Sequence, residues 1–210
     1  MKKSTLIIFL VGILVFLFYA WYSYSSGVTD YISDSVILIG LLIVLFLVNR
    51  ALNLSNFSLI LVILGAVSHL SGVFGWYNAS PFILQYDHVT HLVGLFAISA
   101  VVFDILKPYF GKKRFLNFVL LLMIFFASLG IGSIIEQVEY VGYLKFGTGA
   151  GLLRFGGLGD TPFNEENLRA MDIVGGGWIN TMLDLNYNFL GALAGTLVMY
   201  LINKFKLKKG

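Results

Sequence analysis

Six long apolar runs constrain what this sequence can fold into. Each is close to the roughly 20 residues that an α-helix needs to cross the hydrocarbon core of a bilayer. Of the 210 residues, 58% are hydrophobic and 12% are charged, which leaves too little polar surface for a water-soluble domain of this size. The runs cover residues 4–22, 36–52, 57–76, 87–106, 115–140 and 178–202. We therefore expect one all-α membrane domain over residues 1–210, a polytopic bundle of about six transmembrane helices.

The basic residues predict how this bundle is oriented. Of the 14 Lys and Arg residues, 11 fall on one side of the implied membrane and only Lys145, Arg154 and Arg169 on the other. All three Trp residues lie at the opposite interface, where amphipathic rings are enriched. We expect a plasma (inner) membrane protein with cytoplasmic N- and C-termini. The basic residues occur in short clusters between the apolar segments, where they set the orientation of the protein in the membrane. Nucleic acid is therefore not an expected partner.

The start of the chain allows a second interpretation. Lys2 and Lys3 precede an apolar core, as they do in a cleaved signal peptide. No A-x-A-like cleavage site follows before Tyr24, so we expect the first helix to be retained.

One long connection, residues 141–177, is predicted to lie outside the cytoplasm. Its glycines are followed, within the same connection, by four acidic residues, so a lid over an outer site is one expectation. A glycine-rich phosphate loop is the alternative, but no strand precedes this segment as such loops require. Loop flexibility is the simpler interpretation of the glycines.

A group of ionisable residues lies within or beside four of the predicted spans. Charged groups at membrane depth cost about 2.5–3.5 kcal/mol each on insertion scales, so they require compensating partners. The predicted topology brings all of them to the outer half of the bundle. They are His69, Asp87, His88, His91, Glu136, Glu139 and Asp184.

Helical spacing places these residues on shared faces. Asp87 and His91 are four residues apart, as are Asp184 and Asn188, while Glu136 and Glu139 are three apart. Each pair can therefore project into the bundle interior. On the last span, Gly191 and Gly195 form a small-xxx-small pair that predicts close helix packing.

Carboxylates and imidazoles from several helices form the ligand set of a divalent ion such as zinc, manganese or iron. The chain has no cysteine, so thiolate ligands are excluded. Two alternatives stay open: a hydrogen-bonded network that only fixes helix packing, and a proton or ion relay. The candidate metal ligands are His69, Asp87, His91, Glu136 and Asp184, with Glu139 as candidate general base and His88 and Asn188 as supporting residues.

Several short motifs occur in order along successive spans. They are His69–Leu70–Ser71–Gly72, the D-x-x-x-H of Asp87 and His91, the E-x-x-E of Glu136 and Glu139, and the D-x-x-x-N-x-x-G that runs from Asp184 to Gly191. Over residues 65–195 the chain resembles the YjdF family of prokaryotic multi-pass inner-membrane proteins and, more distantly, the VanZ-like proteins. The YjdF resemblance implies a fold but no settled activity. The VanZ-like resemblance implies an association with lowered glycopeptide sensitivity at the cell envelope.

Three functions are compatible with this sequence. The first is an intramembrane metal-dependent enzyme, a hydrolase or transferase that acts on a lipid or lipid-linked envelope substrate at the outer leaflet. The second is an ion or solute transporter, which the apolar inner halves of the spans disfavour. The third is a non-catalytic factor that binds a lipid or a partner protein. A homo-oligomer is compatible with all three.

Overall fold

The computed structural model describes residues 3–146 and 176–207 and is helical throughout its regular structure. Six of its helices are long and apolar enough to span a membrane, which confirms the predicted fold class. The elements are α1 (Lys3–Ser26), α2 (Asp30–Leu52), α3 (Asn56–Leu70), the 3₁₀ turn η1 (Ser71–Phe74), α4 (Tyr86–Leu106), the 3₁₀ turn η2 (Lys107–Tyr109), α5 (Arg114–Phe146) and α7 (Gly176–Leu207).

Some helices extend beyond the predicted runs. α2 begins at Asp30 rather than at residue 36, and so contains the buried carboxylate of Asp34. α5 continues to Phe146, so residues 141–146 are helical and not part of the predicted loop. The predicted glycine-rich segment at 147–175 lies outside the described residues.

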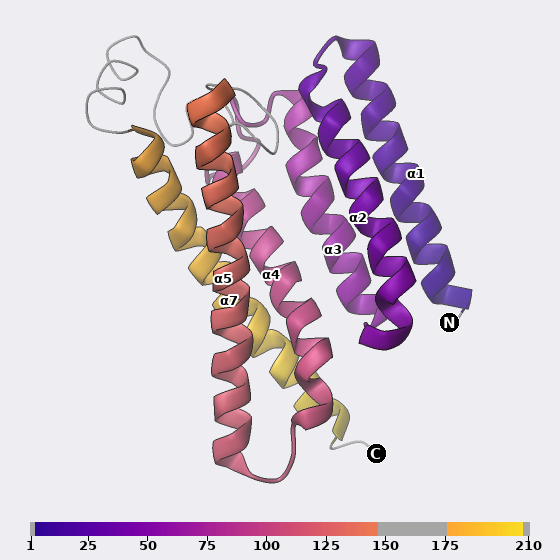
Figure 1. The fold of residues 1–210 in the computed structure, drawn as a ribbon, viewed down its shortest axis with the longest axis vertical. Helices are drawn as coiled ribbons and strands as arrows, with labels where there is room; N and C mark the ends of the chain where they lie inside the picture. The colour runs from indigo at the N-terminus through magenta and orange to yellow at the C-terminus, as the bar shows by residue number, and fades with distance from the viewer. Residues whose placement is uncertain (1–2, 147–175, 208–210) are drawn as a thin grey trace.

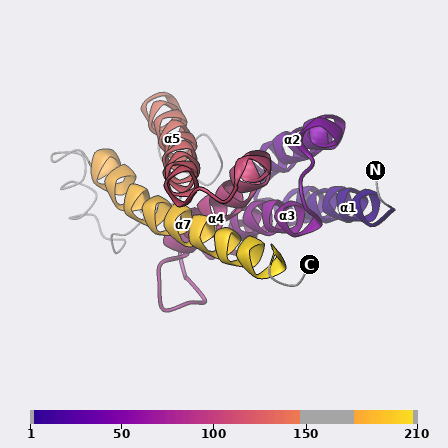
Figure 2. The same ribbon diagram turned by 90° about the horizontal axis from the view of Figure 1, so that it is seen from below.

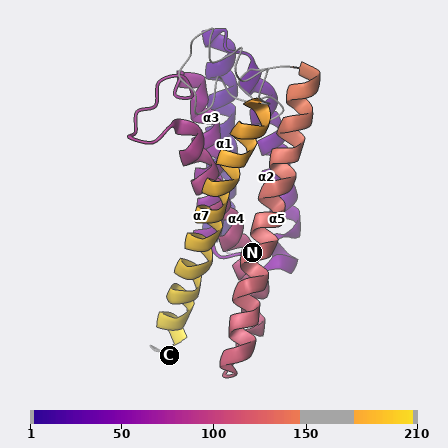
Figure 3. The same ribbon diagram turned by 90° about the vertical axis from the view of Figure 1, so that its left-hand side faces the viewer.

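The helices form two groups that meet along α3 and α4 (Figure 1). α1, α2 and α3 share one apolar core, which includes Phe16, Leu42 and Leu59. α4, α5 and α7 share a second core, which includes Phe103 and Ile124. Seen from below, the two groups lie next to each other with α4 near the middle (Figure 2). A view from the side shows α5 and α7 side by side (Figure 3).

The exterior of the bundle is apolar while small polar residues lie inside it. Leu14 and Leu47 are 65% and 70% exposed, as expected for side chains that face lipid. Ser99 and Ser128 are fully buried, and each hydroxyl donates to a helix carbonyl. This arrangement suits a hydrocarbon solvent, in which polar groups must be satisfied internally.

α4 and α7 approach each other more closely than ordinary side chains would allow. A Cβ atom added at Gly191 would collide with the backbone carbonyl of Leu92. One added at Gly195 would lie 2.8 Å from the carbonyl oxygen of Phe96. The small-xxx-small pair therefore packs directly against the α4 backbone, as the sequence predicts.

We expect Gly191→Ala to destabilise the protein by about 1–3 kcal/mol, because the new methyl group must push two backbones apart. Denaturant-induced unfolding in detergent micelles measures the loss. The matched control is Gly130→Ala on α5, where an added Cβ meets nothing within 4 Å. Equal stability of the two variants would show that the close α4–α7 contact does not matter.

Candidate metal centre

His91 occupies the middle of the candidate site. It lies on α4 one turn after Asp87, and its side chain is only 10% exposed. The helical repeat places both side chains on the same face, with His91 Nε2 and Asp87 Oδ1 3.5 Å apart. α4 therefore supplies one imidazole and one carboxylate to the interior of the bundle.

α7 brings a second carboxylate to the same nitrogen. Asp184 Oδ1 lies 3.6 Å from His91 Nε2, and the Asp184 side chain is 1% exposed. Asp87, His91 and Asp184 offer three ligand atoms that all lie within 4.8 Å of one another. The glycine contacts that hold α7 on α4 occur about two and three turns further along α7, so they fix this approach.

The opposite nitrogen of His91 faces α5. Glu136 Oε1 lies 3.0 Å from His91 Nδ1, within the range of a hydrogen bond. Asn188 on α7 donates from Nδ2 to the same Glu136 oxygen at 2.7 Å, and its Oδ1 lies 3.2 Å from His91 Nδ1. A Cβ at Gly132, one turn before Glu136, would lie 3.4 Å from the Asn188 amide, so α5 packs tightly at this level.

The two sides of the His91 ring have different geometry. On the Nδ1 side, 3.0 Å is a hydrogen-bond distance, and we assign Nδ1 as the protonated nitrogen that Glu136 accepts from. On the Nε2 side, 3.5 and 3.6 Å exceed the usual N–H···O range of about 2.7–3.2 Å. Two ligands at about 2.1 Å from one tetrahedral ion lie about 3.4 Å apart. The Nε2 side therefore has the spacing of ligands around an ion.

The buried charges favour the same interpretation. Glu136 and Asp184 are almost completely buried, and Asp87 shares their surroundings. When Nε2 binds a metal the His91 ring is neutral, so the three carboxylates carry a formal charge of −3, most of which a divalent cation would cancel. In addition, Glu136 Oε2 is buried and has no hydrogen-bond partner among the described residues. Uncompensated carboxylates of this kind are strongly unfavourable in a low-dielectric interior.

Glu139 lies one turn after Glu136, toward the edge of the site. It forms a second group with His91 and Glu136, in which the three ligand atoms are again within 4.8 Å of one another. Unlike Glu136, it is partly exposed. This position suits a residue that contacts an incoming substrate better than one enclosed in the protein core.

His69, a predicted ligand, lies in a separate polar group. Its Nε2 contacts Asp34 Oδ2 of α2 at 2.9 Å, and its Nδ1 lies 3.0 Å from the hydroxyl of Tyr77. His69 belongs to neither of the two candidate ligand groups found among the described residues. Burial raises the pKa of Tyr77 well above its ordinary value, and the negative charge of Asp87 adds to this effect. The Tyr77 hydroxyl is therefore neutral and able to donate a hydrogen bond.

The predicted supporting residues occupy different positions. Asn188 bridges Glu136 and His91, as described above. His88 lies at the interface of α4 and α7, where its ring stacks on Tyr187 with centroids 3.8 Å apart and planes 15° apart.

Two buried carboxylates were not among the predicted site residues. Asp34 is the partner of His69, and its position before the second apolar run concealed it. Asp104 lies at the far end of α4, where Oδ2 accepts from Ser58 Oγ at 2.6 Å and from the backbone N–H of Ser55 at 2.7 Å. The only sequence signal for Asp104 is a carboxylate inside an apolar run; its partners come from another helix.

We expect Asp34 and His69 to contribute to stability as a coupled pair. In a double-mutant cycle of Asp34→Ala and His69→Ala, the interaction between the two changes should be about 1–3 kcal/mol, as for a hydrogen bond to a charged group. Unfolding in detergent provides the four stabilities. Ser128→Ala on α5 serves as an uncoupled partner for His69→Ala. Additive losses for both pairs would contradict the prediction.

No curated protein and no solved structure matches the chain. A family model described as "Predicted membrane protein (DUF2238)" matches residues 4–205, nearly the whole chain. The six apolar helices agree with that description. The chain therefore belongs to the DUF2238 family of membrane proteins.

Proposed function

We propose that this protein binds a divalent metal ion inside the membrane and catalyses a metal-dependent reaction of a lipid or lipid-linked substrate at the outer leaflet. The observation that carries the metal proposal is the position of two carboxylate oxygens 3.5 and 3.6 Å from His91 Nε2. These separations fit ligands of one ion better than they fit hydrogen bonds.

In this proposal each residue has a distinct task. Asp87, His91 and Asp184 hold the ion, which suits zinc, manganese or iron. Glu136 accepts from Nδ1–H of His91 and so fixes the ring with Nε2 toward the ion, a common arrangement behind a metal-ligating histidine. This assigns Glu136, a predicted ligand, a positioning role. Asn188 in turn orients the Glu136 carboxylate.

The chemistry follows from an incomplete ligand set. Three protein ligands are typical of catalytic zinc sites, which keep a position open for substrate. When bound, the ion supplies a Lewis acid that polarises an ester or phosphoryl oxygen. Glu139, at the partly exposed edge of the site, is placed to accept a proton from the attacking nucleophile.

A lipid substrate is supported by the surroundings of α5. The helix turns Glu136 and Glu139 toward the bundle, while Ile134 and Val138 are 61% and 44% exposed on its surface. Hydrocarbon chains in the bilayer therefore lie only one helix width from the carboxylates.

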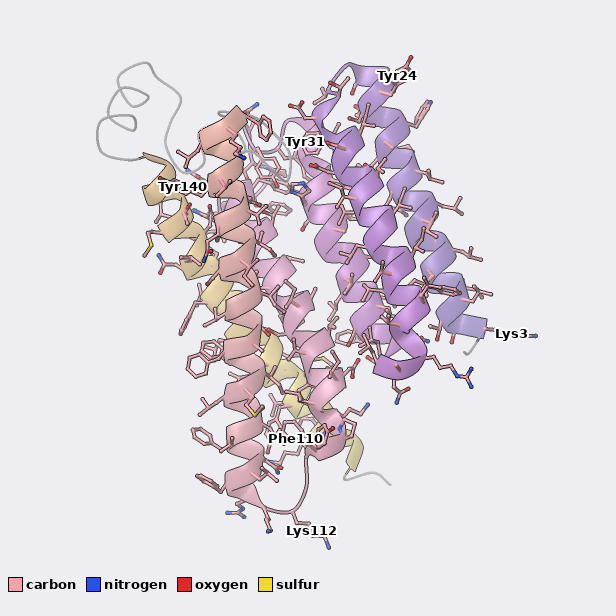
Figure 4. All side chains as sticks on the ribbon, viewed as in Figure 1. Lys3, Tyr24, Tyr31, Phe110, Lys112 and Tyr140 are labelled. Atoms are coloured by element: carbon pink, nitrogen blue, oxygen red, sulfur yellow. The ribbon has the colours of Figure 1, made fainter. Side chains whose placement is uncertain are left out.

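The outer location rests on the distribution of charge. Lys3 and Lys112 lie at one end of the bundle, and Tyr140, one residue after Glu139, lies near the other (Figure 4). Under the positive-inside rule the basic end, with both termini, faces the cytoplasm. The candidate metal centre then faces the outer leaflet of the plasma membrane.

Transport is less well supported by the packing beneath the site. Ala100, Phe103, Ile124 and Met199 form a buried apolar cluster between α4, α5 and α7, on the side of the termini. A permeation route would need polar groups along its length. A site closed at one end is more typical of a catalytic or binding centre.

We expect purified protein to contain on the order of one transition-metal ion per chain, measured by elemental analysis in detergent. His91→Ala and Asp184→Asn should lose the ion because each removes a ligand. Glu136→Gln should keep it with affinity lowered about 10- to 100-fold, as for other residues that orient a ligand. The control is His69→Ala, which should keep the ion. Wild-type protein that stays metal-free after incubation with zinc, manganese and iron salts would refute the metal proposal.

We expect Glu139→Gln to retain the metal ion but to lower turnover about 10²- to 10⁴-fold, the usual contribution of a general base. Turnover is followed by mass spectrometry of phospholipids and lipid-linked phosphates incubated with the protein in vesicles. Loss of the ion in this variant would instead make Glu139 a ligand. If metal-loaded wild-type protein converts no lipid in such a panel, the enzymatic part of the proposal fails while metal binding stands.

A further inference from the structure

A second polar site lies at the end of the bundle opposite the candidate metal centre. It is a pocket of about 860 Å³ between the start of α1, the turn that joins α2 to α3, and η2. Among its lining residues are Arg50 and Lys107, two cationic side chains from different elements. Neither the predicted site residues nor the proposed reaction involves this pocket.

The charge of the pocket is positive. Arg50 is exposed and makes no ion pair within residues 3–146 and 176–207. Lys107 Nζ lies 3.9 Å from Asp104 Oδ1, and the Lys107 side chain is 47% exposed. The other oxygen of Asp104 is already occupied by Ser55 and Ser58. A net positive potential therefore remains at the mouth of the pocket.

The side-chain amide of a mostly buried asparagine also lines the pocket. Asn49 is 7% exposed, and its Oδ1 accepts from the backbone N–H of Leu54 at 3.2 Å. Because a backbone N–H can donate only to an oxygen, this bond fixes which end of the amide is Nδ2. Within the described part of the chain, no acceptor for Asn49 Nδ2 is found. A ligand with acceptor oxygens would satisfy it.

The N-terminus of α3 adds backbone donors. Ser55 Oγ caps the helix by accepting from the N–H of Ser58 at 3.2 Å. The N–H groups of Asn56 and Phe57 belong to the same first turn, where no intrahelical acceptor exists, and both residues line the pocket. The positive end of the helix dipole therefore points toward the cations.

Together these features point to an anion with several acceptor oxygens. A phosphate group matches a guanidinium, an ammonium, an amide and two backbone N–H groups arriving from different directions. The remaining lining includes Phe46 and Leu54, which suit the apolar part of an ester. We infer that this pocket binds the phosphate group of a phosphate ester at the membrane face that carries the chain termini.

Such a phosphate has two sources, an anionic lipid headgroup or a soluble phosphate compound. The test uses the full chain purified in detergent, with dioctanoyl phosphatidic acid as probe and dioctanoylglycerol as the phosphate-free comparison. Microscale thermophoresis measures Kd for each. The proposal expects saturable binding of phosphatidic acid and none of dioctanoylglycerol. Competition by millimolar inorganic phosphate would assign the site to soluble phosphates, and lack of competition would assign it to lipid.

The variants separate a built site from diffuse attraction. Arg50→Gln should weaken the binding of phosphatidic acid about tenfold or more, because it removes a charge-assisted hydrogen bond. Asn49→Asp keeps the acceptor for the Leu54 N–H but replaces the Nδ2 donor with an anionic oxygen. Because this oxygen repels a phosphate, the variant should abolish the binding of phosphatidic acid. The control is Arg114→Gln, which removes the same charge near the same face but outside the pocket lining, and should change Kd less than about twofold.

Thermal unfolding of each variant checks that the fold is kept. Asn49→Asp and Arg50→Gln change different side chains. If one of the two variants fails to fold, the other still tests the proposal. Equal weakening by Arg50→Gln and Arg114→Gln would reduce the effect to general surface charge and overturn the proposal. Absence of phosphatidic acid binding to the wild-type chain would overturn it as well. Neither result bears on the metal centre, which lies at the other end of the bundle.

Discussion

The close contact between α4 and α7 determines how the polar interior is built. Gly191 and Gly195 let the α7 backbone rest on the carbonyls of Leu92 and Phe96, where any larger residue would separate the helices. One to three turns before these contacts, α7 carries Asp184 and Asn188 to the two sides of the His91 ring. If α7 were moved outward by the size of one methyl group, the 3.6 Å separation of Asp184 and His91 would be lost. The close approach of the α4 and α7 backbones therefore sets the distances between the side chains of the candidate site.

Hydropathy was sufficient to predict the fold, because in a bilayer the solvent selects helices long enough to span it. Six spans in the predicted order, and the close packing at the glycine pair, are confirmed. Spacing along each helix also placed Asp87 with His91 and Asp184 with Asn188. These relations are local, since the helical repeat alone aligns residues three or four apart.

Relations between helices were harder to predict. His69 lies in the last turn of α3, where it faces α2 and contacts Asp34. The rotation of α3 that decides this depends on its packing against its neighbours, which leaves no periodic signal in α3 itself. Asp34 was not predicted as a site residue because the polar residues around it made the second span appear to begin at residue 36, whereas α2 begins at Asp30. Similarly, the different roles of Glu136 and Asp184 appear only when the two nitrogens of His91 are seen to face different helices.

The two ends of the bundle carry surplus charge of opposite sign. At the candidate metal centre, carboxylates gather around a single imidazole and leave negative charge that calls for a cation. Among the described residues at the opposite end, Asp104 is the one buried carboxylate. Ser55 and Ser58 donate to one of its oxygens and Lys107 lies near the other, so the surplus charge is positive. An apolar layer that includes Phe103 and Ile124 lies between the cation-seeking site and the membrane face of the termini. Since this layer insulates the two ends, a ligand at either can bind without neutralising the other, and their affinities should be separable by mutation.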